Sequence, residues 1–342
     1  MEKYTAYKDC KDIENCIVNC ITGSIGKYTL FPSYPGSKLG YEWKIRCFFD
    51  PKCKKYTEPF FGGGSVGFAI PNERYEEFWF NDRDPNLAIT YKALVDKETR
   101  EQAIRAILSI EKNNNVEIAK AEFNKAVKNK LSTESSDIEQ YKGQYVDICK
   151  NTYIVYSQSI NGSGNGYSSE VSNEKYKRKV EDRLLNAMST LVNNPKITCM
   201  DGIEVMRQVV DDPEMQIYAD FPYVGLYRKC DKLYNHEMAG LAKHIEGAEV
   251  AKNSKAAVII SGYRSQYEDI PTIYDAILTG DEWHCYEIKE KANHCEIAKN
   301  GKEKERAHEF IWTNRVPEHA GLYVSLTDYK EKITLEEYML LE

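Results

Sequence analysis

The pattern of hydrophobic and polar positions becomes regular near residue 55. Residues 56–60 (YTEPF) form a short β-like run that contains an acid, and residues 61–67 (FGGGSVG) form a glycine-rich turn that leads into apolar residues. A second apolar run at 75–82 ends in acids, and a helical pattern follows at 87–95. Strands, a glycine turn, helical segments and an acid in this succession are typical of the opening of a doubly wound nucleotide-binding sheet.

The pattern is different between residues 96 and 195. Two amphipathic stretches, at 98–110 and 117–127, predict helices, and a polar loop follows the second. Residues 157–170 (SQSINGSGNGYSSE) contain too much glycine, serine and asparagine for a core element. We expect a loop or an exposed hairpin tip there, and a flexible linker is the alternative.

Short apolar runs return after residue 195, with helix-like segments between several of them. These runs lie at 196–201, 215–220, 255–262, 283–288 and 308–314. Alternating strands and helices predict the α/β fold class, here a Rossmann-like sheet with a mostly helical insertion. The predicted parts are an N-terminal extension (1–30), a discontinuous core (31–95 and 196–342) and the insertion (96–195).

Composition and charge limit the protein classes and cellular locations that the sequence allows. The chain has 342 residues, enough to bury a large core, and no apolar run approaches the roughly 20 residues of a membrane span. The first residues show no secretory pattern, so we expect a cytoplasmic protein without a membrane partner. A formal net charge of -7 argues against a simple nucleic-acid binder, although a basic groove can lie on an acidic body. Two local basic clusters could form such a groove, and solvated helix faces are the alternative. One contains Lys120, Lys125, Lys128 and Lys130, and the other contains Lys175, Lys177, Arg178 and Lys179.

Half of the ten cysteines lie in the first sixth of the chain, which raises the question of a metal site. They are Cys10, Cys16, Cys20, Cys47 and Cys53. None of their gaps has the C-x-x-C spacing of a zinc site, and no H-x-x-x-H follows. A reducing compartment also disfavours disulfides. We therefore expect thiols and no metal, and the pairs His284–Cys285 and His294–Cys295 would point to opposite faces of a strand.

Four acids stand at the predicted carboxyl ends of strands: Glu58, Asp82, Asp201 and Asp220. In an open α/β sheet ligands bind at this edge. The glycines at 62–64 let the backbone pass close to a ligand, because they have no Cβ. Asp82 follows them by roughly 20 residues, the separation at which an acid accepts ribose hydroxyls in dinucleotide sites.

The residues beside the glycines favour one cofactor class over another. The turn is not G-x-G-x-x-G, and Glu58-Pro59-Phe60 stands directly before it. A phosphate cradle prefers a helix N-terminus without a neighbouring anion. A cationic or zwitterionic ligand such as S-adenosylmethionine therefore fits better than a dinucleotide, which stays the alternative.

The segment Asp220-Phe221-Pro222-Tyr223 has the groups needed to methylate an aromatic amine. Such an amine is a poor nucleophile, because its lone pair is delocalised into the ring. The Asp220 carboxylate and the Phe221 carbonyl could accept its two N–H bonds and expose the lone pair, while the Tyr223 ring stacks on the extruded base. Pro222 would fix the turn. A plain strand end with a tyrosine packed nearby is the alternative.

Several segments together resemble the Dam-like group of adenine-specific DNA methyltransferases, over nearly the whole chain beyond residue 30. The matching segments are YPGSK (34–38), EPFFGGGSVGF (58–68), NDRDPNLAITYKAL (81–94), MDGIEVM (200–206), ADFPY (219–223), and three later stretches. The resemblance implies S-adenosylmethionine as the cofactor and methyl transfer to the N6 amine of a flipped adenine. The cofactor-binding residues it implies are Tyr34, Lys38, Glu58, Pro59, Phe60, Gly62, Gly64, Ser65, Asp82, Asp201 and Asp220.

One departure from the family lies in the catalytic motif, D-P-P-Y, where Phe221 replaces the first proline. Phenylalanine keeps the backbone carbonyl that the reaction uses, and it gives up some rigidity of the turn. We expect an active enzyme. The alternatives are a weakened or inactive DNA-binding relative that keeps its cofactor, and an RNA adenine methyltransferase.

The resemblance makes the insertion a target-recognition domain within the catalytic core. Asn161 and Asn165 could read adenine edges, and Lys177, Arg178 and Lys179 could hold phosphates. Double-stranded DNA is the implied partner, the enzyme would act as a monomer, and a cognate restriction endonuclease stays open. The residues match no recognition pattern closely enough to name a target sequence.

Overall fold

The structure is a computed structural model of the chain. It describes residues 29–31, 34–110, 116–131, 137–162, 164, 166–168, 180, 183–184, 187–188, 190–191, 193–223, 238, 240–263, 272–292 and 306–315. The predicted N-terminal extension, with Cys10, Cys16 and Cys20, therefore lies almost entirely outside the described residues, as do His294 and Cys295.

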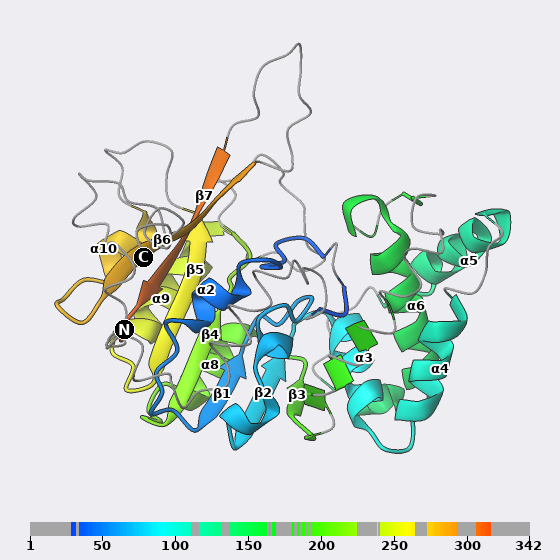
Figure 1. Ribbon diagram of the computed structural model, residues 1–342, viewed down its shortest axis with the longest axis horizontal. Coiled ribbons are helices and arrows are strands. Elements are labelled where there is room, and N and C mark those ends of the chain that lie inside the picture. The colour runs from blue at the N-terminus through cyan, green and yellow to red at the C-terminus, as the bar shows by residue number, and fades with distance from the viewer. Residues whose placement is uncertain are drawn as a thin grey trace, which may run out of the picture.

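Within the described residues, a seven-stranded sheet has the order β3-β2-β1-β4-β5-β7-β6 (Figure 1). The strands are β1 (Lys55–Glu58), β2 (Glu77–Asn81), β3 (Lys196–Thr198), β4 (Met215–Ala219), β5 (Ala257–Tyr263), β6 (His284–Ala292) and β7 (Arg306–Thr313). The first five in this order are parallel, and β7 is antiparallel to both β5 and β6. All the apolar runs predicted as strands are present, which confirms the α/β fold class. The order reverses between β1 and β4, where open sheets bind ligands.

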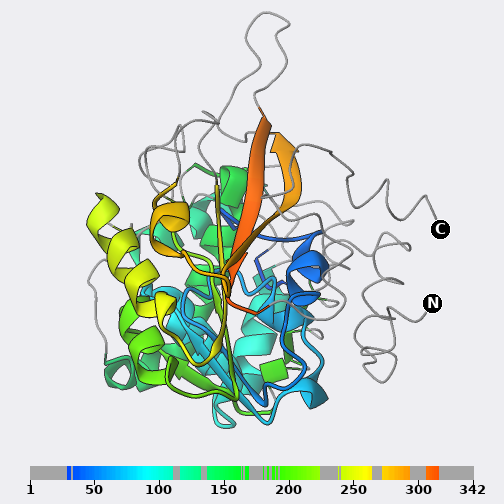
Figure 2. The same ribbon diagram turned by 90° about the vertical axis from the view of Figure 1, so that its left-hand side faces the viewer.

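The sheet is covered on both faces. The helices are α2 (Glu42–Arg46), α3 (Pro85–Val95), α4 (Arg100–Ile110), α5 (Val116–Lys128), α6 (Tyr145–Gln158), α8 (Gly202–Val209), α9 (Gly240–Lys252) and α10 (Ile273–Ile277). In β5, Ala257 and Ile259 belong to one core and Val258 and Ile260 to the other, because successive side chains point to opposite faces. Figure 2 shows the yellow helix α9 and the blue helix α2 on opposite sides of the sheet.

Helices α4, α5 and α6 group beside α3, at the end of the sheet where β3 lies (Figure 1). The sequence pattern predicted α4 and α5 and missed α6. From Thr152 to Gln158 every residue of α6 is buried, so this helix lacks the polar stripe by which an amphipathic pattern is recognised. The boundaries predicted for the insertion stay a prediction.

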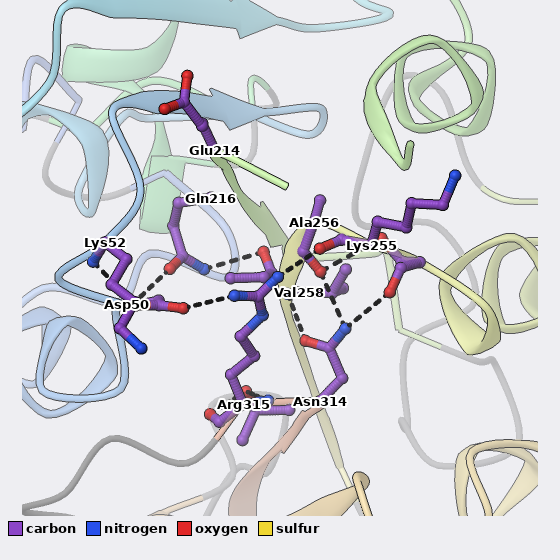
Figure 3. Close-up of polar contacts among 12 residues, drawn as sticks. Asp50, Lys52, Glu214, Gln216, Lys255, Ala256, Val258, Asn314 and Arg315 are labelled. Carbon is purple, nitrogen blue, oxygen red and sulfur yellow. Dashed lines mark hydrogen bonds and ion pairs between the residues drawn. The ribbon is translucent and has the colours of Figure 1, made fainter. Parts of the chain in front are cut away.

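A polar network closes the edge of the sheet at which the parallel strands begin (Figure 3). The guanidinium of Arg315 donates to the Asp50 carboxylate at 2.8 Å and to the carbonyl of Lys255. The Asp50 N–H donates to the side-chain oxygen of Gln216 at 2.8 Å. Asn314 accepts from the Val258 N–H and donates to the Ala256 carbonyl. These bonds join the end of β7 to the starts of β4 and β5.

Other sequence expectations concern thiols and membranes. The described cysteines, which include Cys47 and Cys53, are free thiols. Within the described ranges no group of three or more His, Cys, Asp or Glu side chains could hold a metal ion. In that same part of the chain, no helix combines the length and the apolar character that crossing a membrane requires.

Candidate active site

A pocket opens at the carboxyl edge of the sheet, between the ends of β1 and β4. It encloses about 870 Å³ of space, including its open mouth. Of the residues predicted to bind a cofactor, those that line it are Tyr34, Glu58, Phe60, Gly62, Ser65, Asp82, Asp201 and Asp220. Pro222 of the predicted catalytic segment lines it as well. The carboxyl ends of four separate strands thus contribute acids to one cavity.

The glycine-rich turn after β1 shapes the floor of the pocket. Gly62 and Gly64 have φ values of 50° and 72°, which favour glycine over any side-chain-bearing residue. A Cβ at Gly62 would lie 2.8 Å from the Tyr34 ring, and one at Gly64 would lie 2.5 Å from the Phe68 ring. The turn therefore needs these glycines for both its conformation and its close packing. Pro59 donates no hydrogen bond and its carbonyl accepts one from Asn81.

Two acids flank this turn. The Asp82 carboxylate accepts from the N–H of Gly62 at 2.7 Å and from that of Asp84 at 2.8 Å, so the backbone fixes its orientation. Burial raises the pKa of Asp82 to about 7. Glu58 is 3% exposed and accepts from the Tyr56 hydroxyl at 2.9 Å. Burial raises the pKa of Glu58 well above its usual range, and the nearby charge of Asp220 adds to this effect.

The other end of the pocket contains Asp201, which caps helix α8 by accepting from the Ile203 N–H at 2.9 Å. Its second carboxylate oxygen lies 3.4 Å from the Lys243 ammonium. The Phe60 ring packs against Gly202, where a Cβ would lie 2.5 Å from it. The Phe60 ring therefore lies next to the segment that carries the partly exposed Asp201 carboxylate.

Asp220, at the end of β4, is held by two donors from distant parts of the chain. The Lys38 ammonium lies 2.7 and 2.6 Å from its two carboxylate oxygens, and the Ser261 hydroxyl donates to it at 2.9 Å. Lys38 is 1% exposed. Burial lowers the pKa of Lys38, but the charges of Asp220 and Glu309 more than offset this, and its pKa is raised. The predicted lysine and the predicted carboxylate thus form a buried ion pair.

Tyr223 is buried beside this ion pair. Its hydroxyl donates to the Glu309 carboxylate, and its ring centroid lies 4.2 Å from that of Tyr263. The Lys38 ammonium lies 4.9 Å from the centre of the Tyr223 ring. Sequence reasoning missed Glu309 and Ser261. Both lie in the later segments that resemble the family, at 258–270 and 305–314, but the resemblance gave neither residue a role.

Comparison with known proteins identifies the family of this chain. The family model for D12 class N6 adenine-specific DNA methyltransferases matches residues 34–294. The chain belongs to this family. It is also 29% identical over 182 residues to the Type II methyltransferase M.MjaIII of Methanocaldococcus jannaschii, covering 51% of this chain and 60% of that relative. The chain thus spans about 60% of the length of that relative.

The fold is thus that of a Rossmann-like methyltransferase. Phe221 departs from the D-P-P-Y motif of the family, and its surroundings show how the fold accommodates it. Phe221 is 1% exposed, and its ring centroid lies 4.8 Å from that of Phe60. It also stacks against Tyr274 and packs on Gly247 of α9, where a Cβ would lie 2.7 Å from the ring. The fold therefore has a dedicated space for the phenylalanine that replaces the family's proline.

The DNA-binding residues predicted in the insertion are only partly described. The backbone of Asn161 lies in the 3-10 turn η5 (Ile160–Gly162). Its side chain, and Asn165, Lys177, Arg178 and Lys179, lie outside the described residues. Ser159 and Tyr167 pair as an antiparallel bridge, and Tyr167 packs on Phe123 of α5 at 5.6 Å between ring centroids. The segment is thus a closed hairpin-like loop, and not a flexible linker, where it is described.

This loop is tied to the pocket through α3 and α6. Asp84, next to the pocket acid Asp82, caps α3 and accepts from the Tyr156 hydroxyl of α6 at 3.0 Å. The Asn86 side chain binds both the N–H and the carbonyl of Leu131, at 2.9 and 3.0 Å. The segment that carries Asp82 is therefore the anchor of the helical part.

Proposed function

We propose that this protein transfers a methyl group from S-adenosylmethionine to the exocyclic N6 amine of an adenine flipped out of double-stranded DNA. The observation that supports this most is the position of Asp220. Its carboxylate ends β4, is fixed by Lys38 and Ser261, and lines the same pocket as the glycine-rich turn. A hydrogen-bond acceptor for the amine therefore lies beside the cofactor-binding residues.

The acidic lining of the pocket supports this choice of cofactor. Glu58, Asp82 and Asp201 line the pocket, and a pyrophosphate would disfavour the ionised forms of Glu58 and Asp82, whose pKa values burial already raises. A ligand with an ammonium and a sulfonium would instead be attracted to them. Glu58 and the glycine turn would hold its amino acid part, Asp82 its ribose hydroxyls, and Asp201 with Phe60 its adenine. When bound, S-adenosylmethionine supplies an electrophilic methyl group.

The DFPY segment would orient the amine for attack. Asp220 and the Phe221 carbonyl accept its two N–H bonds, which draws the nitrogen toward a tetrahedral shape and exposes its lone pair. Tyr223 would contribute an aromatic face for the base. A strong general base is not required, because the nitrogen becomes acidic only after it has gained the methyl group. Lys38 orients Asp220 by contacting both of its carboxylate oxygens.

The proposal also includes how the protein recognises DNA, its oligomeric state and a partner endonuclease. The insertion would recognise the target sequence, with its loop at 157–170 and its basic segment on the DNA. The enzyme would act as a cytoplasmic monomer, and a cognate restriction endonuclease would cut the same sequence. The buried Lys38–Asp220 pair and the packed Phe221 favour an active enzyme over a relative that has lost turnover.

The test is transfer of tritium from labelled cofactor to plasmid DNA from a methylation-deficient host. We expect wild type to label the DNA on N6 of adenine, and Asp220→Ala to be slower by on the order of 100-fold or more while it still binds the cofactor. Asp211→Ala, an exposed surface carboxylate, is the matched control and should keep the wild-type rate. Absence of label in wild type, or label that appears in RNA and not in DNA, would contradict the proposal.

A further inference from the structure

Glu309 is a buried carboxylate to which the sequence resemblance assigned no role. It lies on β7, is 1% exposed, and stands beyond the residues that the family model matches. A buried charge is expensive unless it is paired and hydrogen-bonded. The groups that offset the cost of burying Glu309 therefore indicate its role.

Three described partners of Glu309, namely Tyr223, Tyr41 and Lys38, belong to or surround the proposed methyl-transfer site. One carboxylate oxygen accepts from the Tyr223 hydroxyl, and the other accepts from the Tyr41 hydroxyl at 3.4 Å. The Lys38 ammonium lies 3.7 Å from the oxygen that binds Tyr223. Glu309 thus contacts the predicted stacking ring and the cation that holds Asp220.

The position of Lys38 between two carboxylates matters for the reaction. Its ammonium lies 2.6 Å from Asp220 and 3.7 Å from Glu309. An amine that approaches Asp220 must share that carboxylate with Lys38, and the hydrogen bond between them weakens. A second carboxylate keeps the ammonium in place, because it remains attracted from the other side. Without Glu309, Lys38 would compete with the amine for Asp220 alone.

We propose that Glu309 is a positioning residue for methyl transfer, which fixes the Tyr223 ring through its hydroxyl and gives Lys38 a second carboxylate when the amine occupies Asp220. This inference rests on the proposed function. It assigns Glu309 no contact with the base or the cofactor. Its effect passes through Tyr223 and Lys38.

The experiment compares single-turnover tritium transfer to the same plasmid DNA at saturating cofactor and DNA. Glu309→Ala removes both interactions and should slow transfer by about 100-fold, the cost of a misplaced reacting group. Glu309→Gln keeps an acceptor for Tyr223 but loses the attraction for Lys38, so it should recover part of that loss. Cofactor dissociation constants should stay near the wild-type value in both variants. Glu214→Gln, an exposed glutamate at the opposite edge of the sheet, is the matched control.

A double-mutant cycle separates positioning from simple structural support. Tyr223→Phe removes the hydroxyl alone, and it should slow the wild type more than it slows Glu309→Ala, because the two residues act through one contact. If both glutamate variants transfer at the wild-type rate and only their melting temperatures fall, Glu309 is structural and the inference is wrong. Should Glu309→Ala fail to fold, the saturated rate of Glu309→Gln decides between these outcomes. A wild type that labels no DNA overturns the proposed function first, and this inference with it.

Discussion

Phe221 shows how a residue out of the family pattern is accommodated. The lost rigidity of a proline is worth about 0.4–1 kcal/mol in a turn, whereas burying a phenylalanine side chain contributes about 1.5–3 kcal/mol. The ring is buried between Phe60, Tyr274 and Gly247. Packing thus outweighs the lost constraint, and the catalytic turn is held by its side chain.

The contact between Phe221 and Gly247 gives a prediction for stability. Gly247→Ala adds a Cβ 2.7 Å from the Phe221 ring, and overpacking costs about 1–3 kcal/mol. The same change in a helix interior contributes about 1 kcal/mol of stability. We expect the free energy of unfolding in urea to fall by up to about 2 kcal/mol. In a Phe221→Pro background, where the ring is absent, Gly247→Ala should raise it by about 1 kcal/mol.

The Phe221→Pro variant alone is the reference for this cycle. Equal stabilisation by Gly247→Ala in both backgrounds would show that the ring does not press on α9. The urea denaturation slope should stay constant across the four proteins, since a changed slope would point to a changed unfolded state.

At the scale of elements, the sequence pattern predicted what is locally encoded. The strands that end in Glu58, Asp82, Asp201 and Asp220 were predicted, and their acids meet in one pocket because the carboxyl ends of parallel strands share an edge. Ser261 and Glu309 could not be assigned to the site, because their approach depends on how β5 and β7 pair in space. Helix α6 was missed because burial on nearly all sides removes its amphipathic pattern.

The Asn86 side chain joins α3 to the segment that follows α5. This residue is 2% exposed, and its side chain satisfies both polar backbone groups of Leu131. Asn86→Ala would leave these groups without their partner, and a buried unsatisfied group costs about 1–3 kcal/mol. We expect a loss of about 2–4 kcal/mol in unfolding free energy, measured by urea denaturation.

Thr99→Ala is a useful control for this prediction. Its hydroxyl donates one hydrogen bond to a backbone carbonyl, at 2.9 Å from Ala93, on the same helical side of the molecule. It should cost only about 1 kcal/mol. Equal losses in Asn86→Ala and Thr99→Ala would mean that the paired contacts with Leu131 do not anchor the helices.

At the scale of the whole molecule, the network around Arg315 allows stability and methyl transfer to be tested separately. Its residues lie where the parallel strands begin (Figure 3), whereas the pocket lies at the carboxyl ends of these strands. Arg315→Ala removes the partner of the Asp50 carboxylate, whose side chain is 10% exposed. Because the arginine itself is about one third exposed, we expect a moderate loss of about 1–3 kcal/mol in urea denaturation.

The rate of methyl transfer by Arg315→Ala, measured well below its melting temperature, should equal that of wild type. Arg105→Ala, which breaks an exposed ion pair with Glu101, should change stability by less than about 0.5 kcal/mol. A slow Arg315→Ala enzyme that remains fully folded would mean that the two edges of the sheet are coupled.

The order of β5, β7 and β6 also determines when the sheet can be completed during translation. Strand β7 is translated after β6 but lies between β6 and β5. While the ribosome is still translating residues before 306, β7, the strand that links β6 to β5, is absent, and so are Glu309 and Arg315. A nascent chain that already contains the glycine turn and the DFPY segment therefore lacks the contacts of Glu309 with Tyr223 and Lys38. If the proposed function is right, a chain that ends before β7 should transfer no methyl group to DNA.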